Sequence, residues 1–293
     1  LIAYHFPSKA KKILTAFHPD VIHIHTPFFI AKTGIDWGKK HRIPVIGTFH
    51  TLLSEFLDYI PIPTIKHNPI MKQLTWVYTQ HFYKRCDIIT TPTPVLAREL
   101  GEHGFKNVKV LSNAIDYELF SKTKPKAKPQ TNSLAYFGRI SFEKRIDVAI
   151  DALSLLREKG ENVTLTIIGN GPAVESLKKH AKEKNIAALV HFPGPFRGKE
   201  LASEVKKHGI LVAPSPMETQ GLYVLEAMAA GLAVVGCDQR AIPIALGKNE
   251  RGLVFKDGDA ADCAEKIRFL LRNPKKRKEL VTSAKKWVKS YQR

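Results

Sequence analysis

The chain has 293 residues, enough for about two domains of ordinary size, each with its own buried core. Hydrophobic residues make up 44% and charged residues 25%, which excludes a largely disordered chain. The three scattered cysteines exclude a disulfide framework and a cysteine-based zinc site, and they favour a reducing, cytoplasmic compartment. The 46 Lys and Arg against 27 Asp and Glu give a net charge of +19, which predicts an anionic partner: nucleic acid, a membrane surface or a phosphorylated small molecule.

Short β-branched runs alternate with amphipathic stretches along the whole chain, and no apolar run reaches the ~20 residues of a membrane-spanning helix. The first half predicts strands at 21–25, 45–49, 88–91 and 108–111, with helices at 28–40, 69–84 and 94–103. The second half predicts strands at 134–137, 163–168, 189–192, 210–213, 233–235 and 252–255, with helices at 146–159, 173–184, 199–207, 222–230 and 260–271. This alternation is typical of an α/β fold with two Rossmann-like domains.

A lysine- and proline-rich segment separates the two halves and is typical of a linker. We therefore expect a first domain over 1–121, a linker over 122–133, a second domain over 134–273 and a basic helix over 274–293. The apolar residues of that helix predict docking on the protein, and a membrane-surface role for its lysines is the alternative. Ligands bind open α/β sheets where strands end and helices begin, so two such domains predict a cleft.

The segment 214–235 (PSPMETQGLYVLEAMAAGLAVV) predicts a strand end, a loop and a helix. The backbone amides of Gly221, Leu222 and Tyr223 fall at the start of that helix, where N–H groups lack partners within the helix. This place suits phosphate or the oxygens of a sugar.

Two glutamates belong to the same segment. Glu218 lies in the loop and Glu226 about one turn into the helix, and both carboxylates can accept hydrogen bonds from hydroxyl groups. The alternative for Glu226 is an ordinary solubilising residue, but an unpaired charge in its apolar surroundings (YVLEAMAAG) is costly.

The segment 137–147 (FGRISFEKRID) predicts a strand, a tight turn at Gly138 and a helix opening near residue 145. Arg139 and Lys144 then extend from the carboxyl end of the strand, where their charges can neutralise a diphosphate. The alternative is plain solvated charge, and only the position of the two residues favours a site.

Three shorter patterns add detail. Gly169 and Gly171 (IIGNGP) form a turn that permits close backbone approach to a nucleotide, but no full dinucleotide fingerprint follows, which disfavours a dehydrogenase. The run GTFHT (47–51) closes a predicted strand and places His50 at the rim of the first domain, where it can contact a sugar hydroxyl or an acceptor, with a structural histidine as the alternative. The Asp257–Gly258–Asp259 run resembles a metal motif of sugar transfer, but Asp259 is better explained as a helix N-cap.

In combination, these segments resemble the retaining glycosyltransferases of family 4, which have the two-domain GT-B fold. The most specific match is the Glu-x7-Glu motif, Glu218 to Glu226, and it is accompanied in the family's order by FGRISFEKRID, IIGNGP, DIITTPTPVLARELGEHGF, SNAIDYELF and RGLVFKDGDA. The run GTFHTLLSEFLDYIP (47–61) is similar to members that glucosylate diacylglycerol. Family members carry a longer N-terminus, so the resemblance implies an incomplete first domain here.

The resemblance also implies residue roles. Arg139 and Lys144, with Gly138, Gly169 and Gly171 nearby, would hold the diphosphate of the donor, and Glu226 would hold the ribose. Glu218, with the backbone of Thr219, Gln220, Gly221, Leu222 and Tyr223, would hold the transferred sugar, and His50 would contact the sugar or the acceptor. His50 and Glu218 are the implied catalytic residues.

The predicted reaction moves a hexose, glucose or mannose, from a UDP- or GDP-linked donor to a hydroxyl acceptor such as diacylglycerol, with retention at the anomeric carbon and with no metal or other cofactor. Cationic side chains would stabilise the leaving diphosphate. The excess of Lys and Arg further predicts peripheral contact with an anionic membrane, at its inner face. The alternatives are a sugar-nucleotide epimerase of the same fold and a nucleic-acid-binding protein, which lacks support from any recognition motif.

Overall fold

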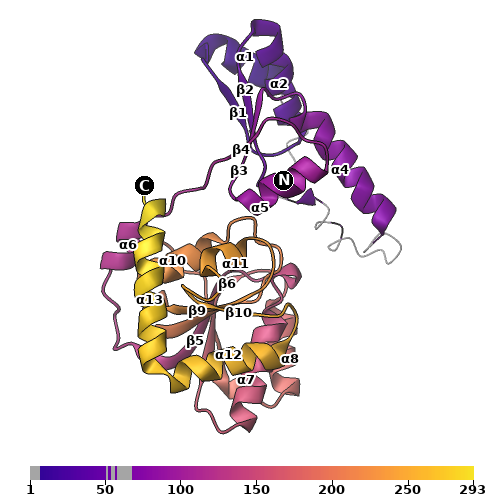
Figure 1. Ribbon diagram of the computed structural model, residues 1–293. Coiled ribbons are helices and arrows are strands. Elements are labelled where there is room, and N and C mark those ends of the chain that lie inside the picture. Colours follow the sequence, from indigo (N-terminus) through magenta and orange to yellow (C-terminus); the bar gives the residue numbers. More distant parts are fainter. Residues whose placement is uncertain (1–6, 51, 54–56, 58–67) are drawn as a thin grey trace. The chain divides into compact units, whose positions relative to one another are not determined.

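The structure is a computed structural model that describes residues 7–50, 52–53, 57 and 68–293. The chain divides into two compact units, Leu1–Ser112 and Asn113–Arg293. Each unit is built around one parallel sheet, as Figure 1 shows, which confirms the predicted α/β class with two parallel sheets.

The first unit contains a four-stranded sheet in the order β1-β2-β3-β4. Its strands are β1 (Ile22–Ile24), β2 (Val45–Thr48), β3 (Ile88–Thr91) and β4 (Val108–Val110), and its helices are α1 (Pro7–Phe17), α2 (Phe29–His41), α4 (Pro69–Tyr83) and α5 (Pro94–Glu102). Asn68 fixes the start of α4, because its side chain accepts hydrogen bonds from the amides of Ile70 and Met71. The fully buried Ile35, Tyr83 and Ile89 belong to the core of this unit.

The second unit contains a six-stranded sheet in the order β10-β9-β8-β5-β6-β7. Its strands are β5 (Gln130–Arg139), β6 (Thr164–Asn170), β7 (Val190–Gly194), β8 (His208–Ala213), β9 (Ala233–Cys237) and β10 (Leu253–Phe255). Its helices are α6 (Tyr117–Lys122), α7 (Ile146–Glu158), α8 (Val174–Glu183), α9 (Gly198–Val205), α10 (Leu222–Ala230), α11 (Ala241–Leu246), α12 (Ala260–Arg272) and α13 (Pro274–Val288), with short 3₁₀ turns η2 (Phe142–Lys144), η3 (Ala187–Leu189) and η4 (Lys289–Tyr291).

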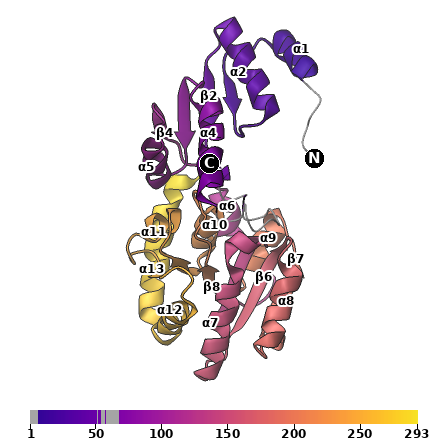
Figure 2. The ribbon, with the colours of Figure 1, turned by 90° about the vertical axis from the view of Figure 1, so that its right-hand side faces the viewer.

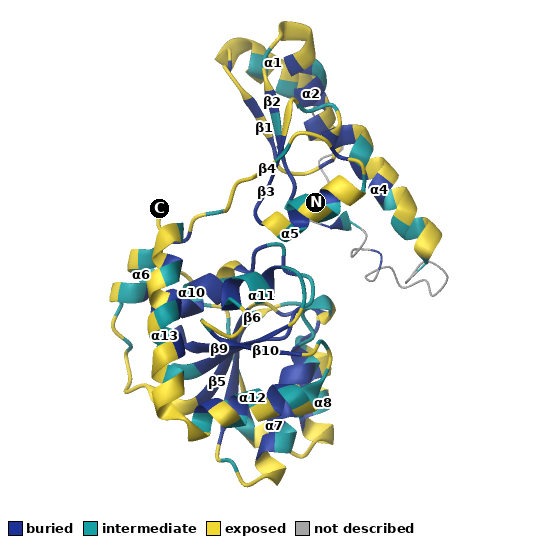
Figure 3. Cartoon of the chain, in the orientation of Figure 1, coloured by how far each residue is buried: buried dark blue, intermediate teal, exposed yellow. Residues whose placement is uncertain are grey.

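Helices enclose the second sheet, which is why its central strands are continuous apolar runs. Helix α7 packs against α8 and α12, while α10 packs against α6, α9 and α13 (Figure 2). Strand β9 is buried at every residue and α10 at most of its residues, as the dark blue ribbons in Figure 3 show. This rigid frame holds the loops at the carboxyl ends of the strands.

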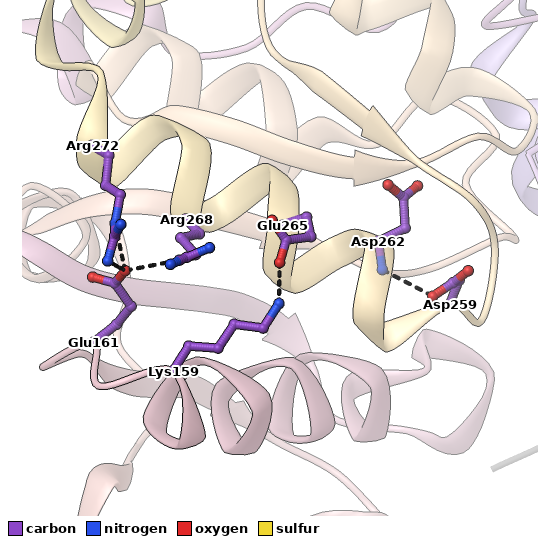
Figure 4. Close-up of polar contacts among 7 residues, drawn as sticks. All are labelled: Lys159, Glu161, Asp259, Asp262, Glu265, Arg268 and Arg272. Carbon is purple, nitrogen blue, oxygen red and sulfur yellow. Dashed lines mark hydrogen bonds and ion pairs between the residues drawn. The ribbon is translucent and has the colours of Figure 1, made fainter.

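Polar side-chain contacts join helix α12 to the segment that follows α7 (Figure 4). Glu161, which follows α7, accepts hydrogen bonds from Arg268 at 3.1 Å and Arg272 at 2.8 Å, and Lys159 pairs with Glu265. At the other end of the helix, the Asp259 side chain accepts a hydrogen bond of 2.9 Å from the amide of Asp262. The predicted N-cap role of Asp259 is therefore confirmed.

The second unit begins earlier than the sequence predicted, at Asn113 instead of after the 122–133 segment. The reason is packing, because Ile115 and Phe120 are buried in the core of the second unit. The predicted linker is also fastened to this unit: the Lys126 amide donates to Ser203 Oγ at 3.0 Å, and β5 already begins at Gln130. Lysines and prolines made this segment look solvated, but backbone contacts hold it in place.

Helices α1, α6 and α11 were not predicted. The last two are six residues each, too short for a helical period to stand out, and α11 contains a proline. Helix α13 docks as expected, with Leu280, Ala284 and Val288 buried. Over residues 7–50, 52–53, 57 and 68–293, no helix is long and apolar enough to cross a membrane.

Candidate functional site

The site predicted on the second unit lies where the order of the strands reverses. From β5 the chain adds β6 and β7 on one side, then returns to add β8 on the other side of β5. The carboxyl ends of β5 and β8 at such a reversal are the usual ligand position of open α/β sheets, and we call this place the crevice.

An ion pair joins the two loops at this crevice. Lys144, in the η2 turn after β5, places its Nζ 2.7 Å from Oε1 of Glu218, in the loop after β8. The two side chains are 20% and 10% exposed, so the contact is largely withdrawn from solvent. The structure thus brings together two predicted site residues that are 74 positions apart in the sequence.

Arg139 and the predicted glycines mark the strand ends around this ion pair. Arg139 is the last residue of β5 and is exposed. A Cβ on Gly169 would lie 1.9 Å from the Gly138 carbonyl oxygen, and one on Gly171 would lie 2.1 Å from the Ile140 oxygen. The two glycines are therefore required first for the contact between the ends of β5 and β6, a structural reason that the sequence pattern did not reveal.

Helix α10 begins at the crevice without a side-chain cap. Gly221 precedes the helix with a φ of +72°, a backbone conformation that suits glycine. Because Gly221 has no side chain, it provides no capping oxygen to the amides of the first turn. Leu222 is 40% exposed beside it. The N–H groups of Leu222 and Tyr223 lie at the helix start, where no carbonyl of an earlier helical turn can accept from them, and the dipole of the helix favours negative charge at this end.

Glu226 lies one turn further along α10. Within the part of the chain that the structure describes, its carboxylate makes no hydrogen bond and no ion pair, and burial raises its pKa to about 7. A carboxylate in apolar surroundings with no partner lowers the stability of the protein, and such groups are found mainly at functional sites. The structure therefore supports the sequence argument against a merely solubilising role.

The side chain of Tyr223 packs against strand β5, whereas the sequence analysis assigned a role only to its backbone. Its ring lies 5.7 Å from that of Tyr136 and 5.9 Å from that of Phe137, both in β5. Its hydroxyl is buried and has no hydrogen-bond partner among the described residues, and burial raises its pKa well above 10.0. Tyr136 in turn donates a hydrogen bond of 2.9 Å to the carbonyl oxygen of Arg139. These ring contacts join the start of α10 to strand β5.

Sequence reasoning missed three further residues in or near these loops, Ser141, Glu143 and Asn113. Ser141 Oγ donates to Oε1 of Glu143 at 2.6 Å, while the other carboxylate oxygen of Glu143 is buried without a partner among the residues described, and burial raises its pKa. Asn113 contacts the side chain of Gln220, which is therefore occupied within the protein. No local pattern signals either contact, since each depends on where a loop folds.

The first unit holds its own polar cluster at the carboxyl end of β1 and β2. A hydrogen bond of 3.0 Å joins His25 Nδ1 and His50 Nε2, and the two rings stack with centroids 5.2 Å apart. Burial lowers the pKa of His50, with smaller contributions from His25 and His23, which favours the neutral form of its imidazole. His50 lies at the strand end as predicted, whereas Thr51 and much of the run 47–61 lie outside the described residues.

These clusters hold no metal site that the structure identifies. Over the described ranges, no group of three or more His, Cys, Asp or Glu side chains is arranged to bind a metal ion. The predicted site residues of the second unit supply two cations, Arg139 and Lys144, the buried carboxylate of Glu218 and the half-buried carboxylate of Glu226.

Comparison with known proteins places this arrangement in a family. Residues 119–287 match the model of "Glycosyl transferases group 1", and residues 1–119 match that of "Glycosyltransferase Family 4". The Sulfoquinovosyl transferase SQD2 of Arabidopsis thaliana is 25% identical over 95% of this chain and 55% of its own length. The Alpha-monoglucosyldiacylglycerol synthase of Streptococcus pneumoniae is 28% identical over 80% of this chain and 55% of its own length. The chain thus spans about half the length of these relatives.

Solved structures agree on the fold. The Anabaena protein Alr3699/HepE in complex with UDP superposes with a TM-score of 0.77 at 18% identity, covering 96% of this chain and 77% of that one. Sucrose-phosphate synthase from Thermosynechococcus elongatus superposes with a TM-score of 0.80 at 18% identity, covering 98% and 73%. The GT-B class predicted from the sequence is confirmed by these matches, and the chain belongs to the group 1 glycosyl transferases.

Proposed function

We propose that this protein transfers a glycosyl group from a nucleotide diphosphate sugar to a hydroxyl acceptor, and that the crevice of the second unit binds the donor. The observation that carries the proposal is the meeting of Lys144 and Glu218 at the strand-order reversal, together with the half-buried carboxylate of Glu226 one turn into α10, which makes no hydrogen bond or ion pair with the described residues. A cation suits a diphosphate, and a carboxylate that lacks partners in the protein suits sugar hydroxyls.

The chemistry requires the bond between the anomeric carbon and the diphosphate to break while positive charge develops on the sugar ring. In the proposed mechanism, Arg139 and Lys144 stabilise the leaving diphosphate, a preorganised electrostatic effect worth several kcal/mol. Glu226 accepts hydrogen bonds from the ribose, and Glu218 from the transferred sugar. The acceptor oxygen bonds to the anomeric carbon on the face from which the diphosphate departs, and the departing phosphate accepts the proton of the acceptor hydroxyl, so the anomeric configuration is retained.

The name of one relative, Alpha-monoglucosyldiacylglycerol synthase, supports a lipid acceptor, and the UDP complex of Alr3699/HepE supports a nucleotide-linked donor. The proposed donor is a hexose, glucose or mannose, linked to UDP or GDP. Contact with an anionic membrane at its inner face is part of the proposal. Since the apolar side of α13 is buried, its exposed Lys275, Lys278 and Lys286 would act there through charge alone.

Titration of the protein with UDP, GDP and ADP by calorimetry tests the donor site. We expect one of these nucleotides to bind, and Lys144→Ala to weaken that binding strongly. Lys178→Ala is the matched control, because Lys178 also pairs with a glutamate, Glu175 at 2.8 Å, but on the exposed helix α8. Equal binding by wild type and Lys144→Ala would reject the role of Lys144.

Product analysis tests the reaction. Sugar nucleotides incubated with diacylglycerol in mixed micelles should give a glycolipid with the anomeric configuration of the donor, read by NMR. Formation of an epimeric sugar nucleotide without an acceptor would instead support the alternative of a sugar-nucleotide epimerase. Co-sedimentation with vesicles that contain anionic lipid, against neutral vesicles at moderate salt, tests the membrane part separately.

A further inference from the structure

Three hydrogen bonds join the side chain of Gln220 to Asn113, 107 residues earlier in the chain. Gln220 Oε1 accepts from the Asn113 amide at 2.9 Å and from Asn113 Nδ2 at 2.7 Å, while Gln220 Nε2 donates to the Asn113 carbonyl oxygen at 2.9 Å. Gln220 is 5% exposed. We call this set of contacts the Asn113–Gln220 clasp.

The clasp holds the loop that forms one side of the crevice. Gln220 lies between Glu218, whose carboxylate meets Lys144, and Gly221, which begins the turn into α10 with a φ of +72°. Glycine has the widest backbone freedom of all residues, so a loop that ends in Gly221 needs a separate contact to fix it. The backbone oxygen of Glu218 accepts a long hydrogen bond of 3.4 Å from the Ala241 amide, and the Glu218 carboxylate meets Lys144 at 2.7 Å. The clasp adds a separate anchor next to Gly221.

We propose that Gln220 is a positioning residue for the donor: through the clasp it fixes the Glu218–Tyr223 loop so that the Glu218 carboxylate and the first amides of α10 are set in place before the donor binds. The proposal rests on the proposed function. It adds a role for the Gln220 side chain to the one expected for its backbone, because the three contacts engage both polar atoms of the side chain within the protein, so that it acts on the donor only through the loop.

The geometry predicts unequal effects for the two partners. Gln220→Leu, which has nearly the same volume, removes all three hydrogen bonds and leaves the backbone amide and carbonyl of Asn113 without them. Asn113→Ala removes only the Nδ2 contact, because the other two use the backbone. Asn113→Asp places a carboxylate oxygen against Gln220 Oε1 and should be worse than Asn113→Ala, since two acceptors then face each other.

The experiment combines two measurements on the full chain. Hydrogen exchange, followed by mass spectrometry without ligand, reports the order of residues 218–223, and calorimetry reports the dissociation constant of the nucleotide that wild type binds. For Gln220→Leu we expect faster exchange over 218–223 and a dissociation constant raised about tenfold; for Asn113→Ala, a rise of less than about threefold. Gln130→Leu is the control, because Gln130 is exposed at the opposite end of β5 from Arg139.

The outcomes separate the proposal from its alternatives. A lowered melting temperature for Gln220→Leu with unchanged exchange over 218–223 and an unchanged dissociation constant would show a purely structural contact and overturn the proposal. Faster exchange with unchanged affinity would overturn it as well, since the order of the loop would then not matter to the ligand. Failure of wild type to bind UDP, GDP or ADP would instead reject the proposed function, and with it any donor for Gln220 to position.

Discussion

The two sheets of this protein differ in the order of their strands, and this difference decides where a crevice forms. In the first unit the described strands follow one another in chain order, β1-β2-β3-β4, so neighbouring loops run the same way. In the second unit the order β10-β9-β8-β5-β6-β7 reverses at β5. The Lys144–Glu218 ion pair lies at that reversal and Glu226 lies in the helix that follows the loop after β8, whereas the polar cluster of the first unit is a small group of histidines.

The largest expected effect tests whether the strand-order reversal is the active crevice. Lys144→Ala should lower the turnover of glycosyl transfer at least about 100-fold, because a preorganised cation at the leaving diphosphate is lost. The variant should also lose about 3 kcal/mol of folding free energy, since Glu218 is then left buried without its partner. Steady-state kinetics and urea unfolding measure the two effects.

The variant pair Lys144→Met with Glu218→Gln separates these two effects. The double variant removes both charges, so it should recover much of the lost stability while turnover stays low. Recovery of turnover in the double variant would contradict a direct role for either charge.

The second prediction concerns the frame of the crevice. Gly169→Ala should destabilise the protein by about 3 kcal/mol or more, because its Cβ would lie 1.9 Å from the Gly138 oxygen and its φ of +143° disfavours other residues. Gly101→Ala in α5 of the first unit is the matched control: nothing lies within 4 Å of its added Cβ, so alanine should stabilise that helix by up to ~1 kcal/mol. Thermal unfolding that ranks the two variants in the opposite order would contradict this account.

The third prediction is that replacing Glu226 raises the stability of the protein but weakens nucleotide binding. Its pKa in the folded protein, about 7, is raised above the ordinary value of 4.5, so the folded state loses stability as the pH rises from 4.5 through 7. Glu226→Gln should therefore stabilise the ligand-free protein at pH 8 by up to about 3 kcal/mol and have little effect at pH 4. The same variant should weaken nucleotide binding about tenfold, because an amide is a poorer acceptor for ribose hydroxyls than a carboxylate.

Melting temperatures across pH 4 to 8, with and without nucleotide, measure both parts of this prediction. A variant that is destabilised at pH 8 would show that the carboxylate has a partner and would contradict the functional assignment of Glu226.

The smallest expected effect is a change in the pKa of His50, in the first unit. Burial is the main cause of the lowered pKa of His50, and the nearby His25 lowers it further. His25→Ala should therefore raise the pKa of His50 towards 6.5 without restoring it fully, and should change the folding free energy by less than ~1 kcal/mol because His25 is exposed. NMR titration of the His50 ring measures this shift, and a pKa that falls on removal of His25 would contradict the charge effect.

The sequence by itself determined the parallel α/β class, most of the strands and long helices, and the residue types of the crevice. Apolar runs of strand length and helical periods are local, so they can be recognised without neighbours. The pattern also isolated Glu218, Glu226, Arg139 and Lys144, because charges beside strand ends and in an apolar helix are unusual.

Only the tertiary structure decided which of these residues meet. The Lys144–Glu218 ion pair, the Asn113–Gln220 clasp and the Tyr136–Tyr223 contact each join segments far apart in the chain, and their geometry follows from the strand order of the sheet. The start of the second unit at Asn113 was also decided there, through the burial of Ile115 and Phe120. Local pattern fixes what a segment can form, whereas packing across the sheet determines its partners, and a partner distant in sequence leaves no local signal.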